Sequence, residues 1–79
     1  MLPTTILIDE APRCVVRPND TKALNRFLRN AKDYLLADRP EGKITHRTAT
    51  EDERARWDNA LGLHRAWGGS DEDFFGVPL

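Results

Sequence analysis

A helical pattern of apolar residues between Asp20 and Asp38 constrains the fold of this chain more than any other feature. Apolar residues recur there at intervals of one and three positions, which places them on one stripe of an α-helix and turns the charged residues outward. The stripe comprises Leu24, Phe27, Leu28, Ala31, Tyr34 and Leu35. We therefore predict a helix over residues 20–38 whose stripe packs against the rest of the chain.

Short runs rich in β-branched residues lie on both sides of this helix. Residues 4–8 (TTILI) and 13–17 (RCVVR) are typical of strands, and the four residues between them suit a hairpin connection. Residues 43–47 (KITHR) alternate polar and apolar side chains and form a third candidate strand. Because an isolated hairpin is marginally stable in water, these strands must pack on helices or gain further strands.

A second helix is predicted to begin at Thr50, which forms a capping-box pattern with Glu53. Gly68-Gly69 is expected to end this helix. We expect Leu28 of the first helix and Trp57 of the second to be buried between the two helices. The apolar stripe of the second helix comprises Trp57, Ala60, Leu61, His64 and Trp67.

These elements together predict an α+β fold, in which a short antiparallel hairpin, with residues 43–47 as a third candidate strand, packs on two amphipathic helices. Residues 1–69 form the predicted small α+β domain, and residues 70–79 form an acidic and aromatic C-terminal tail. A chain of 79 residues has a small core. We therefore also expect it to bury apolar surface in a homodimer or against a partner.

Residues that could carry catalysis or bind a metal form no recognisable motif. Cys14, His46 and His64 are the only soft metal ligands, and their spacing matches no zinc pattern. A nucleophilic Cys14 would need a histidine and an acid, for which His46 and Asp9 are the candidates. The chain has no glycine-rich phosphate loop and no nucleophile elbow. We expect no catalytic residue, no metal and no cofactor, and therefore a protein that is not an enzyme.

The C-terminal tail carries the strongest indication of a binding role. Asp71, Glu72 and Asp73 directly precede Phe74 and Phe75. Negative charge steers an encounter with a basic surface, and buried rings then slow dissociation. In the alternative reading, both rings fold back and complete the core of the chain itself. We favour a non-enzymatic accessory protein that binds and modulates another protein with a basic surface, as inhibitors, antitoxins and phage-encoded regulators do.

The exposed face of the first helix suggests a second function. Lys22, Arg26 and Arg29, with Lys32 at one side, point away from the apolar stripe and could contact phosphates. The alternative is an ordinary solvated face. A small DNA-binding transcriptional regulator that uses helix 20–38 is therefore the competing function. The net charge of −1 makes nucleic acid the less favoured partner.

The sequence contains no pattern that predicts a membrane span or a signal peptide. The longest apolar run is Ile6-Leu7-Ile8, whereas a membrane-spanning helix needs about 20 residues. No basic region followed by an apolar stretch opens the chain. The single cysteine, Cys14, excludes an internal disulfide, which fits a reducing compartment. We expect a cytoplasmic protein with no membrane partner.

Overall fold

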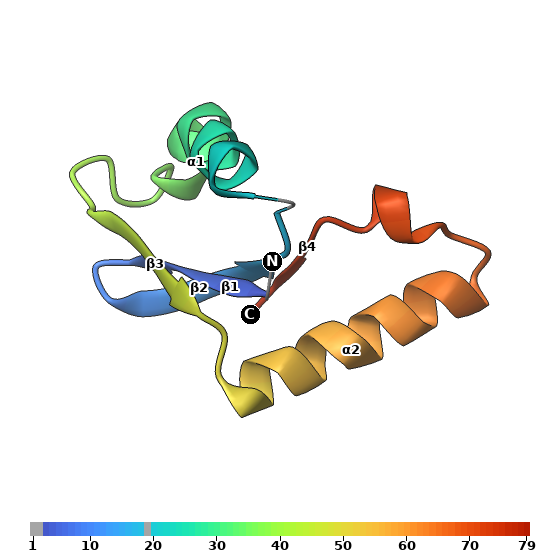
Figure 1. Cartoon of the computed structure of the whole chain (residues 1–79). Helices are drawn as coiled ribbons and strands as arrows, with labels where there is room; N and C mark the ends of the chain where they lie inside the picture. The colour runs from blue at the N-terminus through green and yellow to red at the C-terminus, as the bar shows by residue number, and fades with distance from the viewer. Residues whose placement is uncertain (1–2, 19) are drawn as a thin grey trace.

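The computed structural model describes residues 3–18 and 20–79, which form a four-stranded antiparallel sheet with one helix on each face (Figure 1). The predicted α+β class is therefore confirmed. The order of the strands across the sheet is β3-β1-β2-β4. Within the described residues, neither helix has the length and apolar character needed to cross a membrane. The elements are β1 (Thr4–Ile8), β2 (Ala11–Val16), α1 (Thr21–Leu35), β3 (Ile44–Thr48), α2 (Glu51–Ala66), the 3-10 helix η1 (Asp71–Asp73) and β4 (Gly76–Pro78).

A two-residue turn joins β1 to β2, in place of the four-residue connection predicted from the sequence. Asp9 and Glu10 form it with positive φ angles of 51° and 69°, as a hairpin turn that matches the twist of its strands requires. Strand β2 therefore begins at Ala11 and includes Pro12. The register shifts between Ile6 and Leu7, and such a bulge tolerates a proline because the ladder is already interrupted there.

The first face of the sheet packs against α1. Ile6 and Val16 are buried there with Leu24, which is 1% exposed. Tyr34 belongs to the predicted buried stripe, but this prediction is wrong because its side chain is 82% exposed. It lies at the edge of the stripe, about 100° around the helix from Leu35. The buried residue Leu36, which caps the end of the helix, contributes to this core instead.

The second face of the sheet packs against α2. Trp57 is 1% exposed and lies in a separate core cluster with Val15. The expected burial of Leu28 against Trp57 is therefore wrong, because Leu28 packs in the α1 cluster on the opposite face. Successive strand residues point to opposite faces, so Val15 faces α2 while Val16 faces α1. Consecutive apolar residues such as Val15 and Val16 are typical of a strand that is covered on both faces of the sheet.

The C-terminal end of α2 extends past the sheet (Figure 1). Trp67, which was predicted to lie on the buried stripe, is 88% exposed for this reason. Leu63, one turn earlier, is 56% exposed. The buried residues of α2 are Glu53, Trp57 and Leu61, all in its first two-thirds.

The C-terminal segment adds a strand that the sequence analysis does not predict. In β4, Val77 pairs with Val15 and Gly76 pairs with Val16, so residues 76–78 form the sheet edge beside β2. A Cβ atom at position 76 would lie 3.1 Å from Cγ1 of Val16, so a glycine suits this close approach. Residues 70–75 therefore connect α2 to β4, which is an edge strand of the sheet that α2 covers.

Candidate functional site

Four of the five predicted partner-binding residues line one cavity between the C-terminal segment and the start of α1. We call it the C-terminal cavity; its volume is about 220 Å³. The fifth residue, Asp73, lies outside the lining and accepts a hydrogen bond of 3.0 Å from the Ser70 hydroxyl. The cavity is lined by Arg17, Ala23, Asp71, Glu72, Phe74 and Phe75.

The two phenylalanine rings are placed differently. The Phe74 ring is half-buried, with its centroid 4.7 Å from that of Trp57 and 5.3 Å from that of His64. The Phe75 ring contacts Phe27 at a centroid distance of 5.1 Å, and the residue is still 40% exposed. Phe74 therefore contributes to the core, while Phe75 retains a surface that a partner could cover.

The carboxylates of this segment also differ in their contacts. Asp71 accepts hydrogen bonds of 2.7 Å from Nε and 2.6 Å from Nη2 of Arg65. This guanidinium holds the pKa of Asp71 below its ordinary range. Glu72 is exposed, and its side chain takes part in none of the hydrogen bonds or ion pairs found among residues 3–18 and 20–79. Among the described residues, Glu72 is therefore the cavity carboxylate that forms no ion pair, and the Arg17 guanidinium is a cation in the lining of the same cavity.

Arg17 and Ala23 line the cavity but are not predicted from the sequence, and Arg17 is the charged one. Its guanidinium carbon lies 5.6 Å from the centroid of the Trp57 ring, close enough for a cation–π contact. Its backbone N–H donates a 3.2 Å hydrogen bond to the carbonyl of Phe75. No local signal could have revealed this placement, because the contacts of Arg17 come from segments far away in the sequence.

The basic residues of α1 lie on the side of the helix that faces away from the sheet. Lys22, Arg26 and Arg29 are exposed, as is Lys32 in the last turn. None of the ion pairs found in the described part of the chain involves these four side chains. Asp33 is the acidic residue that shares this face. The basic face is therefore open to solvent, and its binding to nucleic acid stays a prediction.

The residues considered for nucleophilic chemistry do not meet. Cys14 and His46 pair with Ile6 from opposite sides, so their strands are about 10 Å apart. Burial raises the pKa of the Cys14 thiol, which disfavours the thiolate. Among residues 3–18 and 20–79, no group of three or more His, Cys, Asp or Glu side chains is arranged to hold a metal ion.

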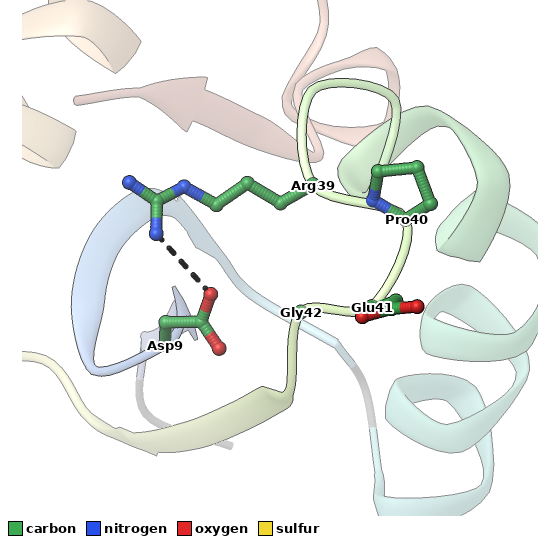
Figure 2. Close-up of a pocket in the computed structure, with 5 residues that line it drawn as sticks. All are labelled: Asp9, Arg39, Pro40, Glu41 and Gly42. Atoms are coloured by element: carbon green, nitrogen blue, oxygen red, sulfur yellow. Dashed lines mark hydrogen bonds and ion pairs between the residues drawn. The ribbon is translucent and has the colours of Figure 1, made fainter.

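A larger hollow of about 470 Å³ lies beside the β1–β2 turn (Figure 2). Figure 2 shows the Arg39 side chain extending from the α1–β3 loop to Asp9. Nη1 of Arg39 lies 3.3 Å from Oδ2 of Asp9. Asp9 also accepts a 2.9 Å hydrogen bond from the backbone N–H of Lys43. These contacts tie the hairpin turn to the loop, so Asp9 and Arg39 of this hollow are already used in holding the fold together.

Comparison of the chain with models of known protein families, with curated proteins and with solved structures found no match. The C-terminal cavity and the basic face of α1 are therefore the surfaces from which a function can be inferred.

Proposed function

We propose that the chain is a small non-enzymatic accessory protein that binds and modulates another protein through the C-terminal cavity. One observation carries the proposal: Glu72, a carboxylate without a partner in the described chain, lines the same cavity as the partly exposed ring of Phe75. A lysine or arginine side chain of a partner suits this pair. Its aliphatic stem would cover the ring, and its cation would meet Glu72.

The size of the cavity favours a protein side chain over a small molecule. Pockets that hold small molecules typically measure about 300–1,000 Å³, whereas this cavity measures about 220 Å³. A single inserted side chain can fill it, while the surrounding surface contributes the remaining contact area. Interfaces commonly take much of their affinity from a few such anchored side chains.

The segment that forms the cavity is held at both ends. Arg65 binds Asp71 before the rings, and the β2–β4 ladder fixes the chain after them. A site that is already ordered loses less conformational entropy when it binds. This supports a preformed docking surface of the kind that an inhibitor or antitoxin presents to its target.

The proposal is tested by affinity capture from the source cell, followed by calorimetry with the captured protein. Phe75→Ala and Glu72→Gln should each raise the dissociation constant, by about ten- to a hundredfold for Phe75→Ala. The matched controls are Tyr34→Ala, which removes an exposed ring on α1, and Glu51→Gln, which removes an exposed acid on α2. Both controls should bind like the unmodified chain. Equal affinity of all four variants would refute the proposal.

A second candidate function is favoured by four exposed cations on α1 that form no ion pair within the described chain, namely Lys22, Arg26, Arg29 and Lys32. A DNA-binding regulator would use these residues to contact phosphates, and its affinity would fall steeply with salt. The test is duplex DNA binding measured at several salt concentrations. Replacing the four cations with glutamine should abolish binding and leave the capture of a protein partner intact. Salt-independent or absent DNA binding would remove this candidate.

A further inference from the structure

Helix α2 exposes a line of four side chains that lies outside the C-terminal cavity. We call this line the α2 flank. Its members recur at intervals of four, three and four positions, so they lie along one side of the helix. Trp67 is 88% exposed and Leu63 is 56% exposed. The α2 flank comprises Arg56, Ala60, Leu63 and Trp67.

No element of the described chain covers this flank. The buried residues Glu53, Trp57 and Leu61 lie on the side of α2 that faces the sheet. The C-terminal segment returns along another side, where Arg65 binds Asp71. Arg65 is two positions from Leu63, which places the two side chains about 200° apart around the helix. The apolar side chains Leu63 and Trp67 of the flank are therefore left uncovered by the described part of one chain.

We infer that the α2 flank binds the same flank of a second copy of this chain, with the two helices antiparallel. The flank is self-complementary in an antiparallel pair of helices. The two-fold axis of this pair passes opposite the midpoint between Leu61 and Gly62. Arg56 then faces Trp67 of the second copy, and Ala60 faces Leu63 of the second copy. The remaining two pairs follow from the two-fold symmetry, as in any isologous dimer.

Each of these pairs combines groups that attract or fit. The Leu63 side chain packs over the small Ala60, which is the knob-into-hole arrangement of paired helices. The Arg56 guanidinium stacks on the face of the Trp67 indole as a cation–π contact. In the described part of the chain, no ion pair involves Arg56, so this cation is available. Antiparallel helix dipoles add a favourable electrostatic contribution.

The dimer contact is short, and its affinity is correspondingly modest. Residues 56–67 span about 17 Å of helix, which buries less surface than a standard interface of about 1,600 Å². Because so short a contact holds few anchoring side chains, we expect a dissociation constant in the micromolar range. The inference does not depend on the proposed function. It leaves the C-terminal cavity free on each copy, so that one dimer presents two cavities to partners.

The test is sedimentation velocity on the full chain between about 5 and 500 µM, the range that a micromolar dissociation constant requires. The expected result is a shift from monomer to dimer. Quenching of tryptophan fluorescence by iodide gives a second measurement, because Trp67 is exposed and Trp57 is buried. Quenching should fall as the concentration rises. A monomer over the whole range would overturn the inference.

Exchanging the facing residues tests the geometry. Trp67→Arg alone places like charges opposite each other and should weaken the dimer at least tenfold, roughly the effect of losing one aromatic anchor. The double variant Arg56→Trp with Trp67→Arg restores a cation facing an indole and should recover most of the affinity. A folded double variant that stays monomeric would refute the antiparallel pairing.

Leu63→Lys should also produce a monomer, whereas the control Tyr34→Lys, which alters an exposed ring on α1, should remain dimeric. A dimer that survives Leu63→Lys, or one that is lost in Tyr34→Lys, would assign the contact to another surface. The two proposals fail independently, because Phe75→Ala should still dimerise and Leu63→Lys should still capture the protein partner.

Discussion

Thr5 on strand β1 donates a hydrogen bond of 2.7 Å to the carboxylate of Glu53 on helix α2, 48 positions later in the chain. Arg47 on β3 donates to both oxygens of the same carboxylate, at 2.7 and 3.1 Å. The backbone N–H of Thr50 donates to it at 2.8 Å and completes the capping box. This single buried side chain therefore fastens the start of α2 to two strands of the sheet.

The contacts of Glu53 should make stability depend on pH. The Arg47 guanidinium is the main cause that lowers the pKa of Glu53 from 4.5 to about 2. A lowered pKa means that the folded state holds the proton less tightly than the unfolded state. The stabilisation is complete above about pH 5 and is lost as the pH falls toward 2, by up to about 3 kcal/mol.

Urea unfolding at stepwise pH should test this dependence. In Glu53→Gln, the free energy of unfolding should be lower at pH 7 and should change less between pH 5 and 2. Glu51→Gln, the control in the same helical turn, should follow the unmodified chain. The free energy of unfolding of Glu53→Gln should still fall somewhat with falling pH, because the pKa values of Asp9 and Asp71 are also lowered. An equally steep slope in Glu53→Gln would contradict the assignment.

The two adjacent phenylalanines should differ in their effect on stability. Phe74→Ala removes the ring that packs on Trp57 and should lower the free energy of unfolding by about 2–4 kcal/mol. Phe75→Ala removes a ring that is 40% exposed and should cost about 1 kcal/mol or less. Thermal melting of the two variants gives the comparison. Equal losses would mean that both rings belong to the core.

The packing of α1 can be tested at two positions of its predicted stripe. Leu24→Ala removes a side chain that is 1% exposed and should cost about 2–5 kcal/mol. Tyr34→Ala, at a residue that is 82% exposed, should change stability by no more than about 0.5 kcal/mol. Urea unfolding measures both. A large loss in Tyr34→Ala would show that the sheet-facing side of α1 extends further than described.

Two glycines near the end of α2 should respond in opposite directions to alanine. A Cβ atom at Gly62 has no neighbour within 4 Å in the described structure, so Gly62→Ala should stabilise the helix by up to about 1 kcal/mol. A Cβ atom at Gly69 would overlap the His64 ring, so Gly69→Ala should lower the melting temperature. Differential scanning calorimetry should resolve both shifts. A destabilised Gly62→Ala would indicate that another surface lies against this position.

Local patterns predicted much of the secondary structure. The spacing of Leu24 and Leu35 predicted α1, and the Thr50–Glu53 pair predicted the start of α2, where the structure has a capping box. The runs around Ile6 and Val15 predicted the two strands of the hairpin. These signals are local because helical periodicity, capping and strand alternation each depend on residues close together in sequence.

The partner of each surface was decided only by the tertiary structure. The apolar stripes of α1 and α2 predicted that each helix buries one side. In the structure each stripe packs on the sheet and not on the other helix, because β2 presents Val15 to one face of the sheet and Val16 to the other. Phe74 is half-buried against Trp57 and Phe75 is partly exposed because β4 aligns with β2 in one register. Strand pairing joins residues far apart in the chain, and the local sequence of residues 70–79 carries no signal for that pairing.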